Sequence, residues 1–307
     1  MRSVLVLGLS LLLVVAVQAH DSPEHSVQDL TEHMHEQGES VPLLLRRARE
    51  YRVLGHTEQA IADWQRVLEM EPDQQRALVE LSRIHLAQNQ FDTALQWIQK
   101  AIAVIKPGAG DTSQLYATRG DAYAAKADYA NALKDYDRAI SDEATQVDWY
   151  LNRSLMQELL DRPDDRIKGL SKGYEATRSA VLYTEWVEAL IDGGQARRAL
   201  RAIEPQLRQA RLKSSWLIRR ACARLSLNRK GNPSRTARDD LKTAIAEIDI
   251  RLNPARPDVD LLLDRALAQL LLGEPAAAHE DVALAKNHGA APRQLERWRR
   301  LELRARM

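Results

Sequence analysis

The chain has 307 residues, a formal net charge of +1 and one cysteine. A single cysteine excludes an intrachain disulfide and a cysteine-based zinc site, and the near-zero charge gives no sign of a nucleic-acid partner. Aromatic residues make up only 5% of the chain, while strong helix formers such as Ala, Leu, Arg, Glu and Gln dominate it. The composition therefore favours a helical protein that depends on its packed core.

The first nineteen residues have the order of parts that is typical of a secretory signal peptide. Arg2 supplies one positive charge, Val4 to Val17 is almost wholly apolar, and Val17-Gln18-Ala19 places small residues at the −3 and −1 positions of a cleavage site. The alternative is an uncleaved membrane anchor, but this apolar run is shorter than the roughly 20 residues needed to span a bilayer. We expect cleavage after Ala19, export to a periplasm or out of the cell, and no stable membrane span in the mature chain.

Histidine and carboxylate residues gather between positions 20 and 40. Four of the eight histidines lie there, in the stretches His20-Asp21-Ser22-Pro23-Glu24-His25 and Glu32-His33-Met34-His35-Glu36. Imidazole and carboxylate groups are ligands for zinc, copper or nickel, although His33 and His35 would point to different sides of a helix. One hypothesis is therefore weak Zn²⁺ or Cu²⁺ binding by a non-helical segment. The other, which we favour, is a short helix over 26–37 that caps the first structural unit. The metal-binding candidates are His20, His25, His33 and His35.

A pattern of small and aromatic residues recurs along residues 41–291. Its clearest copy is Leu115-Tyr116-Ala117-Thr118-Arg119-Gly120-Asp121-Ala122-Tyr123, followed by Ala132, Tyr136 and Ala139. This copy resembles the signature of the tetratricopeptide repeat, in which an aromatic residue, Leu-Gly and Tyr precede Ala, Phe and Ala at fixed spacing. The resemblance implies two antiparallel helices per repeat, with small residues where the helices approach closely and large residues between them.

Similar units follow one another at about 41–73, 74–110, 147–179, 180–212, from 214 with an insertion near 228–234, and 259–290. The unit at 147–179 is the most divergent, because Arg166 and Gly173 stand where Ala is expected. Residues 292–307 read as one more helix, which would cover the apolar end of the array. No stretch shows the alternation typical of strands. We therefore predict an all-α fold, an α-solenoid of about seven helical hairpins wound into a right-handed superhelix.

Arginine replaces the usual Leu before the small residue of the first helix in five units. An aspartate follows 16 residues later in three of these units and 20 residues later in the unit with the insertion. A buried arginine is tolerated when it is paired, so we predict structural ion pairs between helices rather than a ligand-binding stripe. Arg153 has Gly169 at the expected place, which makes it the arginine most available for another role. The predicted pairs are Arg47–Asp63, Arg119–Asp135, Arg220–Asp240 and Arg265–Asp281.

The resemblance also implies a binding surface, because the first helices of successive tetratricopeptide repeats line a concave face. That face would be basic near its N-terminal end and acidic in the middle. Chaperone-binding members clamp a peptide carboxylate with Lys, Asn and Arg; Arg49 and Arg83 fall one repeat apart in the same way, but the Asn and Lys are missing. We expect an acidic partner segment to dock at the basic end. The candidate groove residues are Arg49, Arg52, Arg76, Arg83, Asp121, Asn152 and Glu188, with Glu158, Glu185, Asp192, Asp260, Leu263, Asp264 and Leu267 also on this face.

The sequence contains no Gly-x-Ser-x-Gly and no phosphate-binding glycine loop. We therefore predict a non-catalytic, exported adaptor that binds a peptide or protein on the concave face, with no nucleic-acid partner and no enzymatic activity. The alternative hypothesis is a metal-binding or metal-responsive exported protein that uses the N-terminal histidines and offers the repeats as a docking platform. No cofactor is expected beyond the Zn²⁺ or Cu²⁺ of that alternative.

Overall fold

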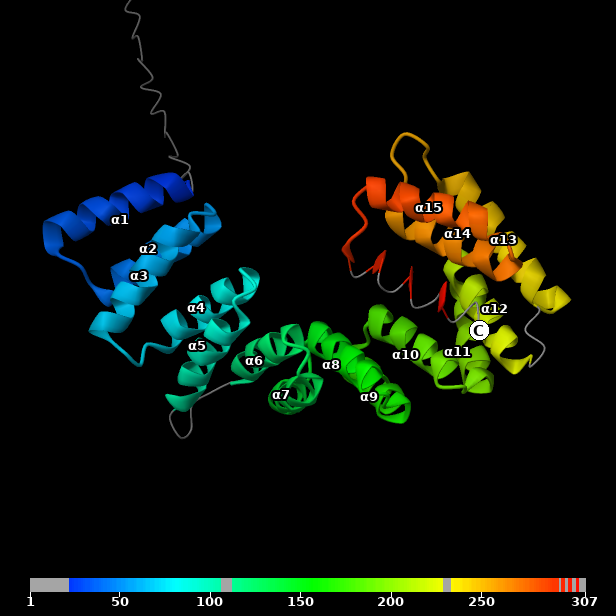
Figure 1. Ribbon diagram of the computed structural model, residues 1–307, viewed down its shortest axis with the longest axis horizontal. Helices are drawn as coiled ribbons and strands as arrows, with labels where there is room; N and C mark the ends of the chain where they lie inside the picture. Colours follow the sequence, from blue (N-terminus) through cyan, green and yellow to red (C-terminus); the bar gives the residue numbers. More distant parts are fainter. Residues whose placement is uncertain are drawn as a thin grey trace, which may run out of the picture. The chain divides into compact units, whose positions relative to one another are not determined.

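The computed structural model describes residues 22–105, 112–228 and 233–292, and six positions further on: 294, 295, 298, 299, 302 and 303. The proposed signal peptide and His20 lie outside these residues. The described part forms fifteen α-helices and no strand (Figure 1), which confirms the all-α prediction. None of its helices is both long and apolar enough to cross a membrane.

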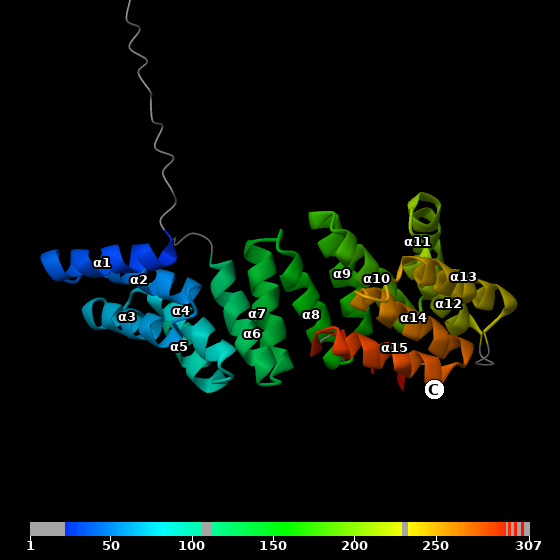
Figure 2. The ribbon, with the colours of Figure 1, turned by 90° about the horizontal axis from the view of Figure 1, so that it is seen from above.

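Helix α1 precedes a series of helix pairs, each of which falls within one of the predicted units (Figures 1 and 2). Within each of the two compact units described below, successive helix pairs pack against one another as an all-α solenoid. The helices are α1 (Pro23–Gln37), α2 (Val41–Val53), α3 (Thr57–Met70), α4 (Gln75–Ala87), α5 (Phe91–Ala103), α6 (Ser113–Ala125), α7 (Tyr129–Asp142), α8 (Val147–Leu159), α9 (Pro163–Thr177), α10 (Ala180–Asp192), α11 (Ala196–Gln209), α12 (Ser214–Leu227), α13 (Arg235–Arg251), α14 (Val259–Leu272) and α15 (Pro275–Asn287).

A residue with a positive φ ends the first helix of a pair and lets the chain turn into the second. At Gly55 and Gly273 φ is 76° and 88°, a conformation in which the missing Cβ avoids strain. The next amide then bonds back across the helix end, from His56 N to Tyr51 O at 2.8 Å and from Glu274 N to Gln269 O at 2.9 Å. These bonds satisfy carbonyl groups that the helix end would otherwise leave without a donor.

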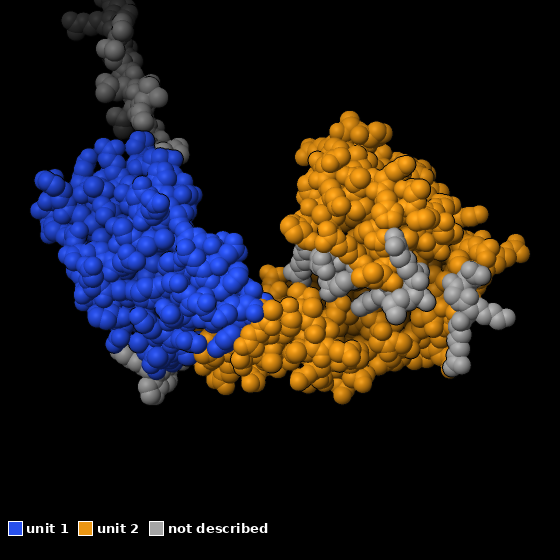
Figure 3. All heavy atoms as spheres, viewed as in Figure 1, with its two compact units in different colours: residues 1–110, 121–126 blue, residues 111–120, 127–307 orange. Residues whose placement is uncertain are grey.

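The chain divides into two compact units, which are described separately (Figure 3). The first unit comprises residues 1–110 and 121–126, and the second comprises residues 111–120 and 127–307. In the first unit, Leu30 and Met34 of α1 are buried against the core of the following helices, which includes Leu44 and Trp64. Helix α1 begins at Pro23, three residues before the predicted start, because Ser22 accepts a bond from the His25 amide and caps the helix.

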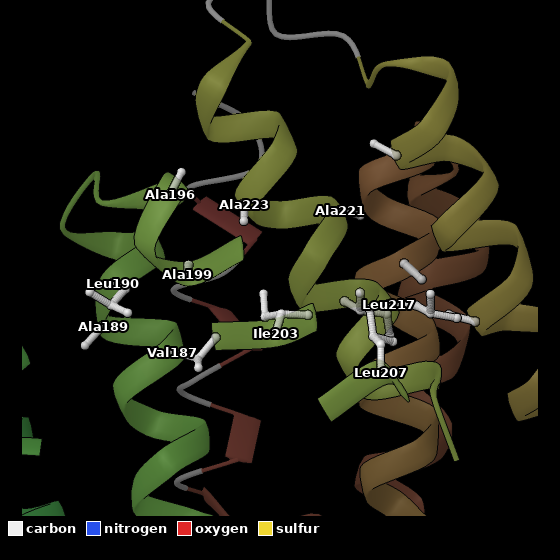
Figure 4. Close-up of a cluster of buried hydrophobic side chains, with 14 of the residues drawn as sticks. Val187, Ala189, Leu190, Ala196, Ala199, Ile203, Leu207, Leu217, Ala221 and Ala223 are labelled. Atoms are coloured by element: carbon white, nitrogen blue, oxygen red, sulfur yellow. The ribbon is translucent and has the colours of Figure 1, made fainter. Parts of the chain in front are cut away.

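The second unit has a continuous core in which small side chains sit between helices (Figure 4). Ala199 of α11 and Ala221 of α12 are fully buried, next to large residues such as Leu190 and Ile203. Small residues allow the helices to approach closely, and large residues fill the space between them. Helices α8, α10, α12 and α14 also contact one another in turn. We call the surface that these four helices form the first-helix face.

Four arginines of first helices bind both carboxylate oxygens of an aspartate on the second helix of the same pair. Arg119 donates from Nε to Asp135 Oδ2 and from Nη2 to Asp135 Oδ1, both at 2.7 Å. Hydrogen bonds to the aspartates raise the pKa of Arg47, Arg220 and Arg265 above the usual value of a guanidinium. The structure thus brings together every pair that the spacing predicts: Arg47–Asp63, Arg119–Asp135, Arg220–Asp240 and Arg265–Asp281.

Two of these arginines also reach back to the preceding pair of helices, a contact that the sequence analysis missed. Arg220 Nη1 lies 3.2 Å from Glu204 Oε1 on α11. Arg265 Nη1 likewise contacts Asp249 on α13. In both cases the acidic residue lies 16 positions before the arginine, so a search for acids on both sides would have found it. Each guanidinium therefore joins second helices of two neighbouring pairs.

The prediction that Arg153 is the most available arginine is wrong. Its side chain is only 12% exposed, with Nη1 3.4 Å from Asp137 Oδ1. The guanidinium lies over the Tyr150 ring, 5.1 Å from its centre. A Cβ at Gly169 would come within 2.5 Å of Arg153 Nη2. Gly169 therefore leaves the space that the Arg153 guanidinium fills. This packing explains why position 169 has a glycine where the four paired units have an aspartate.

Replacing Asp135 with Ala should destabilise the protein, because the replacement removes the carboxylate to which Arg119 donates two hydrogen bonds. Removing one member of a buried ion pair costs about 3–5 kcal/mol. Arg119 is 23% exposed, so we expect a loss of about 2–3 kcal/mol in the free energy of unfolding. Urea denaturation followed by circular dichroism measures it.

The matched control is Asp92→Ala, which removes a carboxylate that is 80% exposed and pairs with Lys126. An exposed pair of this kind contributes at most about 1 kcal/mol. Equal stability of the Asp135→Ala variant and the parent protein would show that the pair has no structural role.

Candidate functional site

A cavity of about 330 Å³ opens on the first-helix face of the second unit. Three first helices, α10, α12 and α14, supply most of its walls, and two residues that follow α15 complete them. We call it the first-helix cavity. It is lined by Glu188, Ile191, Asp192, Ile218, Arg219, Cys222, Asp260, Leu263, Asp264, Leu267, Gln294 and Trp298.

Carboxylates dominate the charged groups of the cavity. Glu188 and Asp192 come from α10, and Asp260 and Asp264 come from α14. Residues four positions apart lie on the same side of a helix, so the spacing places both carboxylates of each helix on the cavity side. Among the described lining residues, Arg219 supplies a guanidinium beside these carboxylates. The described lining residues therefore include four carboxylates and one guanidinium.

Hydrogen bonds hold the polar side chains of the cavity in place. Arg219 donates from Nη2 to Glu188 Oε1 at 2.7 Å and from Nη1 to the Ser215 carbonyl oxygen at 3.0 Å. Gln294 Nε2 donates to Asp260 Oδ1 at 2.7 Å. Arg219 thus has a fixed position beside Glu188, and the segment after α15 is tied to the start of α14.

Apolar side chains also line the cavity. Ile191, Ile218, Leu263 and Leu267 line it together with Trp298. The Trp298 side chain is 5% exposed and packs in a cluster with residues of α14 and α15. Its indole Nε1 has no hydrogen-bond acceptor among the described residues. The described lining residues therefore combine carboxylates with apolar side chains.

A buried arginine that the sequence analysis classed as a divergent alanine position lies beside the cavity. Arg166 of α9 donates from Nη1 to Asp192 Oδ2 at 2.9 Å and from Nε to Ser154 Oγ at 3.1 Å. Its Nη2 lies 3.4 Å from Glu158 Oε2 and 3.8 Å from Glu185 Oε2. One guanidinium therefore faces three carboxylates of the first-helix face. The sequence signal that could have revealed this group is an arginine at a position where a small buried residue is expected, on a helix that lies in the chain between two first helices that carry acidic residues.

Burial raises the pKa of the Cys222 thiol to about 12, and the carboxylates of Glu188, Asp192 and Asp264 add to the effect. Arg219 acts in the opposite direction. Because a raised pKa favours the protonated thiol, Cys222 stays uncharged and weakly nucleophilic at neutral pH.

The predicted basic end lies in the first unit and is divided in two. Arg49 and Arg76 line a cavity of about 440 Å³. Arg52 and Arg83 instead flank Glu80, at 3.7 Å and 3.1 Å. Glu80 is not among the predicted groove residues, and it neutralises part of the positive charge that we expected to attract an acidic segment.

The remaining candidates are spread over the chain. Asp121 belongs to the first unit and Asn152 to the second, and neither lines the two cavities described above. Of the seven candidate groove residues, Glu188 is the one that lines the first-helix cavity. The other residues of the predicted face that line it are Asp192, Asp260, Leu263, Asp264 and Leu267.

Three of the four N-terminal histidines lie on a helix in the structure. His25, His33 and His35 belong to α1, so His33 and His35 point to different sides. In the described part of the chain, no three His, Cys, Asp or Glu residues come close enough together to hold a metal ion. His20 lies outside that part, and metal binding at this end stays a prediction.

The raised pKa of Cys222 predicts slow alkylation of the folded protein. The rate with iodoacetamide should keep rising through pH 9 and 10, because the thiolate is the reactive form. Mass spectrometry at a series of pH values measures this rate. The same chain unfolded in urea serves as control, since its one cysteine should react with an ordinary pKa of about 8.5. A folded-state rate that levels off near pH 9 would contradict the assigned environment.

Comparison with known proteins finds a family match in two segments of the chain. Two family models, both described as tetratricopeptide repeat, match residues 45–110 and 113–141. The first-helix cavity lies outside these residues. Among curated proteins, no sequence matches this chain.

Several solved structures share the fold. A tetratricopeptide repeat protein from Parabacteroides merdae is 16% identical, with a TM-score of 0.60 over 86% of this chain and 98% of that one. The C-terminal part of a TPR repeat-containing protein from Cytophaga hutchinsonii is 12% identical, with a TM-score of 0.60 over 82% and 98% of the two chains. MamA is 18% identical, with a TM-score of 0.50 over 58% and 96%. From the matched repeats and the packed helix pairs it follows that this chain is a tetratricopeptide repeat protein.

Proposed function

We propose that this protein is an exported, non-catalytic adaptor that binds a segment of a partner protein in the first-helix cavity. Tetratricopeptide repeats are scaffolds for protein–protein interaction, and the proposal assigns that role to one place on the array. The observation that carries it is the cavity itself, which three consecutive first helices line with both apolar and charged side chains. Protein recognition uses this combination of an apolar anchor site and fixed polar groups.

The chemistry of the cavity supports binding rather than catalysis. Its thiol is held protonated by burial and by neighbouring carboxylates, so it is a poor nucleophile. Its guanidinium is held by Glu188 and a backbone carbonyl. Fixed side chains of this kind favour the recognition of a complementary surface.

Export is the second part of the proposal and depends on residues 1–19. The single charge, the apolar run and the small residues before His20 support it. Removal of this segment would leave a mature chain that starts at His20.

Site-specific photocrosslinking in the source cells tests the proposal. A photoreactive amino acid at Leu263, which is partly exposed in the cavity, should crosslink to a defined protein. The same amino acid at Ala246, exposed on α13 outside the cavity, is the matched control and should not. Mass spectrometry of the product should also find His20 as the first residue of this chain.

Each part of the proposal has its own contradicting result. No crosslinked protein at Leu263, or the same products at both positions, would overturn the binding role of the cavity. A chain that retains residues 1–19 in the crosslinked product would overturn export with cleavage.

A further inference from the structure

A further cavity, of about 430 Å³, opens in the second unit among α9, α10 and α11. Its described lining includes three aromatic side chains, Tyr174 of α9 and Tyr183 and Trp186 of α10, together with Ala202 of α11. We call it the aromatic pocket. None of its described lining residues also lines the first-helix cavity. The two cavities are therefore formed by different side chains.

The aromatic pocket occurs where another hairpin has an ion pair. Trp186 and Ala202 are 16 residues apart and occupy the positions that Arg119 and Asp135 have in the α6–α7 hairpin. Alanine has no carboxylate and is smaller than aspartate. The α10–α11 hairpin therefore has an apolar cavity wall at the place where the α6–α7 hairpin has two charged hydrogen bonds.

Contacts among the rings hold the aromatic wall of this pocket in place. The ring centre of Tyr183 lies 4.9 Å from that of Tyr174 and 5.5 Å from that of Trp186. The Tyr183 hydroxyl donates to the Ala202 carbonyl oxygen at 2.8 Å, and burial raises its pKa, so it stays uncharged at neutral pH. A wall that is already ordered loses little conformational entropy when a ligand packs on it.

Two arginines of α11 also line the aromatic pocket. Arg198 and Arg201 are three residues apart, so they lie on the same side of the helix. The Arg198 side chain donates to Gln195 Oε1. In the described part of the chain, the Arg201 side chain takes part in no hydrogen bond and no ion pair. A guanidinium in this state can bind a carboxylate through two parallel hydrogen bonds.

A glutamate limits where a second carboxylate can lie in the aromatic pocket. Glu175 of α9 is among the lining residues, is exposed, and accepts a hydrogen bond from Ser171 Oγ at 3.3 Å. Because like charges repel, a carboxylate of a ligand is expected at the arginines of α11 and not beside α9. The aromatic wall is left for an apolar side chain.

We propose that the aromatic pocket docks an acidic segment of a partner protein. An aspartate or glutamate of the segment pairs with Arg201 and Arg198, and the apolar side chain next to it packs on Trp186 and Ala202. The volume of about 430 Å³ lies within the roughly 300–1,000 Å³ of ligand pockets and suits two side chains rather than a folded domain. A free inorganic anion would leave the aromatic wall uncovered. The inference adds a second binding site and does not depend on the first-helix cavity.

Fluorescence anisotropy with two labelled peptides tests the inference on the full mature chain. The first is a nine-residue Gly/Ser peptide with three glutamates and two leucines, and the second carries glutamine at the three glutamate positions. Glutamine has nearly the shape of glutamate without its charge. We expect the glutamate peptide to bind at least about tenfold more tightly, which corresponds to about 1.4 kcal/mol.

A pair of charge variants decides whether the arginines bind the peptide. The pocket variant, Arg198→Gln with Arg201→Gln, should weaken binding of the glutamate peptide by about tenfold or more. The control variant, Arg235→Gln with Arg251→Gln, removes the same number of positive charges at exposed positions of α13 and should bind as the parent does.

A pair of size variants decides whether the peptide enters the pocket. Ala202→Met narrows the pocket without changing its charge and should also weaken binding by about tenfold. Ala246→Met makes the same change at an exposed position of α13 and should have no effect. Circular dichroism verifies that all four variants are folded.

Four results would overturn the inference: equal binding of the two peptides, equal loss in the two charge variants, unchanged binding by Ala202→Met, or no measurable binding of the glutamate peptide. A self-association of the protein that depends on Arg198 and Arg201 would also overturn it, because a second copy would then occupy the pocket. Tighter binding of a labelled DNA oligonucleotide that is lost in the same pocket variant would replace the acidic segment with a nucleic acid. None of these results affects the crosslink at Leu263, so this inference and the proposed function can fail separately.

Discussion

A guanidinium held by both oxygens of a buried aspartate is the interaction on which this helical array depends. The pairs Arg47–Asp63, Arg119–Asp135, Arg220–Asp240 and Arg265–Asp281 each join the two helices of one hairpin with nearly the same bond lengths. Such a pair has a directional, two-bond geometry that apolar packing lacks. It therefore fixes the rotation of the first helix of each of these four hairpins about its own axis. That rotation decides which residues, at i and i+4, reach the first-helix face.

The hairpin formed by α8 and α9 departs from this arrangement in a way that shapes the binding face. Gly169 takes the place of the aspartate and makes room for Arg153, while Arg166 of the same helix extends its guanidinium toward three carboxylates of α8 and α10. Carboxylates that face one another across helices repel unless a cation lies between them. Arg166 thus allows the acidic residues of α8 and α10 to lie close together, next to the first-helix cavity. The acidic character of this face and the divergence of the repeat have the same physical origin.

Contacts within one hairpin could be predicted from the sequence, and contacts between distant segments could not. The spacing of 16 residues places Asp63 opposite Arg47 because both helices have regular lengths and a short turn between them. The same regularity puts Asp260, Leu263, Asp264 and Leu267 on one side of α14. Gln294 and Trp298 escaped prediction, because only the folded chain shows that the segment after α15 meets α12 and α14. The positive charge of the predicted basic end was overestimated. Glu80 of α4 pairs with Arg83 on the next turn of the same helix and with Arg52 of α2.

A double-mutant cycle on Arg265 and Asp281 tests most directly whether the ion pair, and not the packing around it, joins the two helices. The cycle compares the free energies of unfolding of the parent protein, Arg265→Met, Asp281→Ala and the double variant. Because the pair is linked by two charged hydrogen bonds of 2.8 and 2.7 Å, we predict a coupling free energy of about 2 kcal/mol, within the range of about 0.5–3 kcal/mol for contacting residues. A coupling below about 0.5 kcal/mol would contradict the account and assign the stability of the hairpin to its apolar contacts.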